Sequence, residues 1–123
     1  MAKLNRVQLI GNLGRDPESH MTPTGKKVCT FSVAVSRRRR GEGDKDAADW
    51  FFVETWERLA EICEKYLSKG RLVFIEGRLH TDRYEHEGET RYSTKVIASQ
   101  MMMLDRPDVE AEVAVEEPTV DIE

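Results

Sequence analysis

The aromatic residues of one short segment are spaced so that several of them share a face. Alternate residues of an extended strand point to the same side, which places Trp50, Phe52 and Trp56 on one face of residues 49–56. The residues between them are mostly apolar too, although a sheet needs only one apolar face for its core. An exposed aromatic face can stack on nucleic-acid bases, worth roughly 1–3 kcal/mol per base. Packing under loops or in a subunit interface remains the alternative for these side chains.

A run of positive charge precedes the aromatic segment. It consists of four consecutive arginines: Arg37, Arg38, Arg39 and Arg40. Arginines that neutralise phosphates release counterions from the nucleic acid and make its binding salt-dependent. A solvated loop is the ordinary structure for such a run, and it remains the alternative on the sequence alone. The adjacency of basic run and aromatic strand favours nucleic acid more than either feature does alone.

A third candidate lies near a predicted hairpin turn. Tyr84 stands close in sequence to His80, Arg83 and His86, a combination suited to base stacking plus phosphate contact. Alternatively, Tyr84 is an ordinary residue of an amphipathic hairpin. Weaker candidates for phosphate contact elsewhere in the chain are Lys3, Arg6, Arg78 and Arg83.

Motifs that would indicate an enzyme are missing. The sequence has neither a phosphate-cradling GxxxxGK[ST] motif nor a GxSxG nucleophile motif. The three histidines lack metal-ligand spacing with either cysteine. Cys29 and Cys63 fall on predicted apolar faces, so we interpret both as packing residues. We therefore predict no catalytic residue, no metal site and no cofactor.

Charge and composition limit the class of protein. The 123 residues correspond to one domain, and a share of 39% hydrophobic residues allows one modest core. The net charge of −4 combines a mildly basic body with residues 105–123, which carry eight acidic residues and one basic residue. No apolar run approaches the roughly 20 residues of a membrane span, and residues 1–6 are not typical of a secretory signal. We expect a cytoplasmic, reduced protein.

Hydrophobic periodicity predicts five strands and one helix. Alternation is clearest in residues 27–37, where Cys29, Phe31 and Val33 share the predicted core face. The period changes to that of a helix from Leu59 to Leu67, and we expect Lys69-Gly70 to end this helix. The remaining strands are predicted at residues 4–11, 49–56, 71–84 and 90–104, the last two joined by a turn around Gly88.

The order strand-strand-strand-helix-strand-strand is that of the OB-fold, a five-stranded Greek-key barrel. We expect this domain to span residues 1–105. Residues 106–123 are acidic, lack aromatic residues and show no periodicity, so we expect a short disordered tail.

Several motifs together resemble the bacterial single-stranded DNA-binding protein family over about residues 3–105. They are Asn5-Arg6-Val7, Gly11-Asn12-Leu13-Gly14-Arg15-Asp16-Pro17, Asp49-Trp50 to Trp56, Leu59-Ala60-Glu61, Tyr66-Leu67-Ser68-Lys69-Gly70, Ile75-Glu76-Gly77-Arg78-Leu79, Tyr92, and Met103-Leu104. The resemblance implies an OB-fold homotetramer that binds single-stranded DNA without sequence preference. It implies roles in DNA replication, recombination and repair at the nucleoid, without catalysis or cofactor.

The resemblance also assigns residues. Trp50, Trp56 and Tyr84 match positions at which the family stacks bases. A further stacking position falls near Arg39, and a basic residue is common in the family where this chain has Phe52. Family members dock replication and repair proteins through an acidic tip that ends in Pro-Phe, whereas this tail ends with Asp121, Ile122 and Glu123.

Two other functions stay open on the sequence alone. An OB barrel can bind a protein partner of a replication complex through the same aromatic face, because a fold does not determine a function. A small OB nuclease would need clustered carboxylates for a metal ion, and the sequence shows no convincing cluster of this kind.

Overall fold

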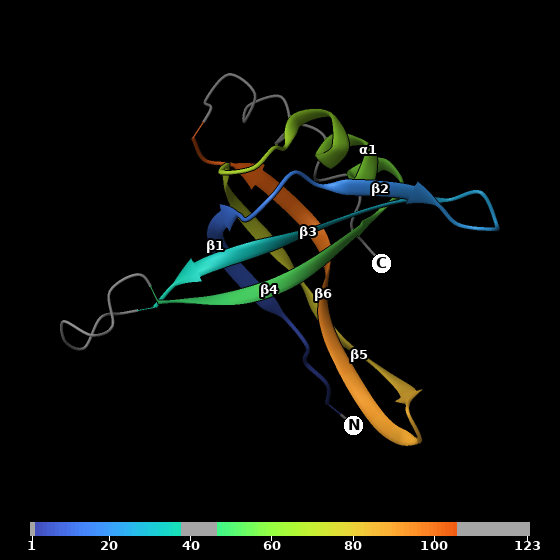
Figure 1. The fold of residues 1–123 in the computed structure, drawn as a ribbon. Coiled ribbons are helices and arrows are strands. Elements are labelled where there is room, and N and C mark those ends of the chain that lie inside the picture. The colour runs from blue at the N-terminus through green and yellow to red at the C-terminus, as the bar shows by residue number, and fades with distance from the viewer. Residues whose placement is uncertain (1, 38–46, 106–123) are drawn as a thin grey trace.

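The computed structural model describes residues 2–37 and 47–105 (Figure 1). Arg38, Arg39 and Arg40 of the basic run lie outside the described residues, and so does the predicted acidic tail with Asp121, Ile122 and Glu123. The described residues form six strands and one helix. They are β1 (Val7–Leu13), β2 (Glu18–Met21), β3 (Lys27–Ser36), β4 (Ala48–Trp56), α1 (Glu57–Tyr66), β5 (Leu72–His86) and β6 (Glu89–Met103).

The strands close into a barrel. The sheet has the order β1-β5-β6-β4-β3-β2, and β1 also pairs with β3, which closes the barrel and leaves β2 as an edge strand beside β3. Neighbouring strands are antiparallel except β4 and β6, which pair in parallel at Val53↔Val96 and Glu54↔Ile97. The predicted OB-fold and its order of elements are confirmed.

One strand was not predicted. β2 is only four residues long and pairs with β3 from Glu18↔Thr30 to Met21↔Lys27. Its side chains are mostly polar and exposed, so they show no alternation of apolar and polar residues. Backbone pairing with β3, rather than burial, places this segment in the sheet.

The core fills the barrel and is covered at one end by α1. Val33, Val53 and Ile75 are completely buried inside, and Cys29 and Phe31 of the predicted core face are buried beside them. The helix adds Leu59, Ala60 and Cys63 to this cluster. Figure 1 shows α1 at one end of the barrel and the hairpin of β5 and β6 extending away from it.

The helix ends earlier than predicted. Its last residue is Tyr66, and Leu67 is extended, with φ −90° and ψ 150°. This conformation lets Leu67 bury its side chain in the core while its N–H still donates to the carbonyl of Cys63. Gly70 is left-handed, with φ 91°, but it shapes the next turn instead of stopping the helix. The prediction of a stop at Lys69-Gly70 is therefore wrong by three residues.

The predicted hairpin is confirmed and longer than expected. β5 and β6 pair from Val73↔Met103 to His86↔Glu89, joined by Glu87 and Gly88. Both turn residues have positive φ, the conformation of a two-residue turn that matches the twist of the strands. From residue 78 to residue 94 every residue is exposed, so this part projects from the barrel as a two-stranded arm. Across the described parts of the chain, no helix is long and apolar enough to span a bilayer.

Candidate nucleic-acid interface

The outward face of β4 carries the three predicted stacking residues. Trp50, Phe52 and Trp56 expose 61%, 48% and 37% of their surfaces, so none of them belongs to the core. The β3 residues that pair with Trp50 and Phe52 are Ala34 and Ser32. Their small side chains leave the neighbouring rings uncovered. Packing beneath described loops is thereby excluded for these aromatics.

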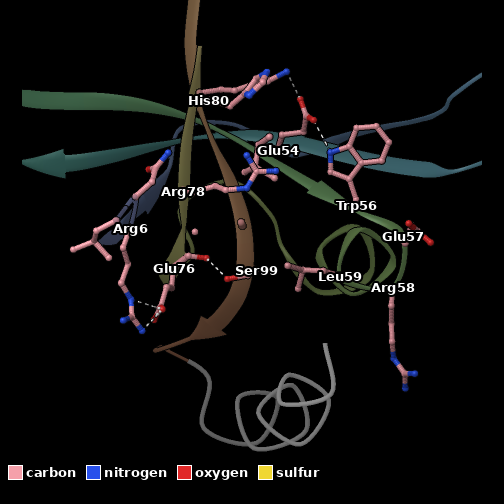
Figure 2. A pocket seen from close by; sticks show the side chains of 16 residues that line it. Arg6, Glu54, Trp56, Glu57, Arg58, Leu59, Glu76, Arg78, His80 and Ser99 are labelled. Atoms are coloured by element: carbon pink, nitrogen blue, oxygen red, sulfur yellow. Dashed lines mark hydrogen bonds and ion pairs between the residues drawn. The ribbon is translucent and has the colours of Figure 1, made fainter. Parts of the chain in front are cut away.

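A carboxylate interrupts this aromatic face. Glu54 points outward between Phe52 and Trp56 yet is only 8% exposed. Its Oε2 accepts a hydrogen bond from the indole Nε1–H of Trp56 at 2.5 Å, as Figure 2 shows. Its Oε1 lies 2.7 Å from Nζ of Lys95 on β6. Both carboxylate oxygens are therefore used within the protein.

The contacts of Glu54 continue into the arm. Nζ of Lys95 also lies 3.2 Å from Oδ2 of Asp82, and Oδ1 of Asp82 lies 3.0 Å from Nε2 of His80. The carboxylates of Glu54 and Asp82 raise the pKa of Lys95. Lys95 and His80 in turn lower the pKa of Asp82. Lys95 thus keeps its charge and joins β4 to both strands of the arm.

Tyr84 lies on the same continuous face. Alternation along β5 puts it on the side of His80 and Asp82, and the register places Lys95 directly opposite His80. Because Lys95 contacts Glu54, this side of the arm continues the outward face of β4. The tyrosine is 46% exposed. The fold therefore brings all four predicted stacking residues to one side of the molecule.

A groove of about 1560 Å³ runs beside the Glu54–Lys95 contact. Its lining includes Trp56, His80 and Arg78, and Figure 2 shows the side chain of Arg78 inside it. The start of α1 and the N-terminal segment around Arg6 complete its walls. The groove is open to solvent and combines aromatic, basic and acidic groups.

Two of the predicted phosphate-contacting arginines already hold carboxylates. Nη2 of Arg6 lies 2.7 Å from Oε2 of Glu76, and Nε of Arg37 lies 3.1 Å from Oδ1 of Asp49. Hydrogen bonds from Gln8 and Arg6 lower the pKa of Glu76. These partners compete with phosphate for the two guanidinium groups.

The other predicted basic residues differ from these two. Lys3, Arg78 and Arg83 are exposed and form no ion pair with another residue of the described segments. Arg38, Arg39 and Arg40 lie outside those segments, so their predicted role remains a prediction. Arg78 lines the groove, whereas Arg83 pairs with Tyr92 on the side of the arm away from Tyr84.

Sequence reasoning missed Lys95 and its link to Asp82. The signal that could have found them is Glu54, a carboxylate among aromatic residues that needs a cation once it is buried. Which cation meets it depends on the parallel pairing of β4 with β6. That pairing joins segments about forty residues apart, so local pattern alone does not indicate it.

The geometry gives no support to catalysis. Among residues 2–37 and 47–105 no three His, Cys, Asp or Glu side chains are placed to hold a metal ion. Cys29 and Cys63 are completely buried in the core. Burial raises the pKa of Cys29 to about 11, which makes it a poor nucleophile at neutral pH. The site is suited to binding.

Comparison with known proteins decides the family. The model of the single-strand binding protein family matches residues 4–104. This chain belongs to that family. The match covers every described strand and the helix, so the aromatic face, the arm and the groove of this single-strand binding family member all lie within the matched residues.

Curated relatives and a solved structure agree with this assignment. The chain is 41% identical to the single-stranded DNA-binding protein of Thermotoga maritima, over 95% of this chain and 85% of the relative. It is 44% identical to single-stranded DNA-binding protein 2 of a serotype V strain of Streptococcus agalactiae, over 82% of this chain and 77% of the relative. Its fold is similar to that of the Plasmodium falciparum SSB in complex with ssDNA, with a TM-score of 0.76, 29% identity, and coverage of 85% of this chain and 98% of the other.

Proposed function

We propose that this protein binds single-stranded DNA without sequence preference and is not an enzyme. The observation that carries the proposal is the continuous exposed face that holds Trp50, Phe52, Trp56 and Tyr84. Every base has a π-face, so stacking on these rings is independent of sequence. Family membership and relatives named single-stranded DNA-binding proteins support the same function.

Phosphate contacts would accompany stacking. We assign them first to Arg38, Arg39, Arg40, Lys3 and Arg78. Arg6 and Arg37 would contribute less, because Glu76 and Asp49 already hold them. Arg83 would also contribute less, because it lies on the side of the arm away from Tyr84. Each phosphate neutralised releases counterions, so affinity falls as salt rises. The basic groups thus hold the strand while the aromatic groups hold its bases.

Assembly and partners are further parts of the proposal. We infer a homotetramer, in line with the exposed apolar side chains of Leu4, Ile10 and Leu79, which self-association would cover. The protein would coat single strands exposed in replication, recombination and repair, in the cytoplasm at the nucleoid. Residues 1–105 would form the binding domain, and the acidic tail 106–123, with Asp121, Ile122 and Glu123 at its end, would contact other proteins.

Tryptophan fluorescence during titration with oligothymidine, at low and at high salt, tests this function. Trp50 and Trp56 are the two tryptophans of the chain. We expect strong quenching, a Kd that rises with salt, and a loss of affinity of roughly 1–3 kcal/mol for Trp56→Ala. Blunt duplex DNA of matched length is the control and should quench much less.

Two results would count against the proposal. Absence of quenching at either salt concentration would mean that the aromatic face does not meet bases. Tight binding of a protein partner that does not weaken with salt would instead favour an interaction module that uses the same face.

A further inference from the structure

We propose that Glu54 is a positioning residue for the DNA site. It fixes the indole of Trp56 and, through Lys95, holds the arm so that the rings of β4 and Tyr84 form one track. This inference rests on the proposed function, because it assigns a role within the same face. Charge repulsion alone predicts that removing the Glu54 carboxylate strengthens DNA binding, whereas this proposal predicts that removing it weakens DNA binding.

The location of Glu54 is the first observation. A carboxylate on a face that binds a polyanion repels it, and a carboxylate whose side chain is only 11% exposed also loses most of its hydration. A valine or threonine, common in strands, would fit the outward position between Phe52 and Trp56 without either cost. The carboxylate must therefore contribute something that an apolar side chain does not.

The bond to Trp56 is the second observation. The ring torsion of an exposed tryptophan is broad, because χ2 joins an sp³ to an sp² carbon. The 2.5 Å hydrogen bond from Nε1–H to Oε2 of Glu54 restrains that torsion at the ring edge. A bond at the edge leaves the face of the ring available for a base. Glu54 thus orients the stacking surface before DNA arrives, which lowers the entropy cost of binding.

The third observation concerns the arm. β4 pairs with β6 only at Val53↔Val96 and Glu54↔Ile97. Beyond these pairs β5 and β6 form a two-stranded ribbon, which twists strongly when nothing else supports it. Within the described residues, the contact of Glu54 with Lys95 is the one ion pair or side-chain hydrogen bond between β4 and residues 78–95. Lys95 extends it to Asp82, so the spacing from Trp56 to Tyr84 depends on this link.

The test compares binding of an oligothymidine with binding of an abasic strand of the same length. Glu54→Val removes both contacts and one negative charge. Glu54→Gln keeps one oxygen that can accept from the indole but loses the ion pair with Lys95, because its amide nitrogen cannot accept a hydrogen bond. Asp49→Asn is the matched control, since it removes one charge from the same strand without touching Trp56. All variants are first compared by thermal unfolding.

We expect Glu54→Val to weaken oligothymidine binding about threefold to tenfold, a fraction of what stacking on one ring contributes. It should leave abasic binding unchanged or slightly tighter, because that strand has no bases to stack. Asp49→Asn should not weaken binding to either strand, and Glu54→Gln should fall between Asp49→Asn and Glu54→Val. If Glu54→Val binds oligothymidine as well as the wild type or better, the proposal is overturned.

A second measurement needs no DNA. In a Trp50→Phe background Trp56 is the only tryptophan, so its fluorescence anisotropy reports the mobility of that ring. Glu54→Val should lower the anisotropy, and Glu54→Gln should largely retain it. Unchanged anisotropy in Glu54→Val overturns the role of Glu54 even if the variant binds poorly. Failure of the wild type to bind oligothymidine would instead overturn the proposed function, so the two failures are distinguishable.

Discussion

The ring of Trp50 lies directly against the backbone of Gly14. A Cβ atom built on Gly14 would stand 2.5 Å from Cζ3 and 2.7 Å from Cη2 of the indole. Gly14 follows β1, and Trp50 belongs to β4, so the contact joins two segments that are not paired to each other in the sheet. The absence of a side chain at Gly14 leaves room for the Cζ3–Cη2 edge of the ring, and most of Trp50 stays exposed to solvent.

Gly14→Ala should therefore displace Trp50 without unfolding the barrel, because the atoms in the way belong to a side chain that can move. We expect a shifted emission of Trp50, measured in a Trp56→Phe background, and a loss of part of the roughly 1–3 kcal/mol of one stacking contact. Gly25→Ala is the control for backbone strain. Its Cβ would meet nothing within 4 Å, but its φ of 89° is left-handed, so it should lower stability without shifting the emission of Trp50. Emission and affinity that match the wild type would contradict this role of Gly14.

The two tyrosines of the arm should differ in their effects on binding. Tyr84 lies on the side that joins the β4 aromatics, whereas Tyr92 pairs with Arg83 on the opposite side and is 66% exposed. Tyr84→Ala should weaken oligothymidine binding by roughly 1–3 kcal/mol, and Tyr92→Ala should change it little. Fluorescence titrations of both variants measure this. Equal losses would show that both sides of the arm meet DNA.

Gly77 should be essential for the barrel. It lies where the β5–β6 register shifts, and a Cβ at this position would overlap the carbonyl oxygen of Ile97 and the backbone of Ala98. Because backbone cannot move aside as a ring can, Gly77→Ala should lower the free energy of unfolding by about 3 kcal/mol, the upper part of the range for overpacking. Urea denaturation measures this. A loss no greater than that of Gly14→Ala would argue against the steric reason.

A surface link between α1, β2 and β3 should give stability that depends on pH. Glu64 of α1 binds Nζ of Lys27 and accepts a 2.7 Å hydrogen bond from Oγ of Ser19. These contacts lower the pKa of Glu64 below its usual 4.5, with Lys27 the larger cause. A lowered folded-state pKa stabilises the fold above that usual value, and the contribution is lost as pH falls through the folded-state pKa.

Glu64→Gln should therefore be less stable than the wild type at neutral pH, and the difference should shrink below pH 4.5 as Glu64 of the wild type is protonated. The raised pKa of Lys27, due first to Glu64, acts in the opposite direction. Its contribution is present below the usual 10.5 and is lost only as pH rises through the higher folded-state value. Urea titrations of both proteins over pH test this, and a difference that is constant with pH would contradict it.

Local features of the chain were predictable from the sequence. Alternation placed Trp50, Phe52 and Trp56 on one face, and the same rule placed Cys29 and Phe31 in the core. Side-chain direction in a strand depends only on the parity of the residue number, which any sequence displays. The hairpin turn at Gly88 and the family resemblance also came from residues close together in the chain.

The helix end and the short strand β2 were harder to predict from the sequence. Leu67 lies outside the helix because its extended backbone lets its side chain pack in the core. Glu18–Met21 forms a strand because it pairs with β3. In both places the deciding partner is distant in sequence, and the local residues alone favour another outcome. Propensity is a weak guide where tertiary contacts compete with it.

Residue types and strand parity were enough to identify the aromatic and basic residues and to tell which of them share a face of their strand. Which of those faces is exposed, and which charges meet on it, depends on contacts between distant strands. The parallel pairing of β4 with β6 places Lys95 beside Glu54, and the antiparallel pairing of β1 with β5 places Arg6 beside Glu76. The side to which a side chain points follows from its position in its own strand. Which charged residue lies beside it depends on the register between strands that are distant in sequence, and closure of the barrel sets that register.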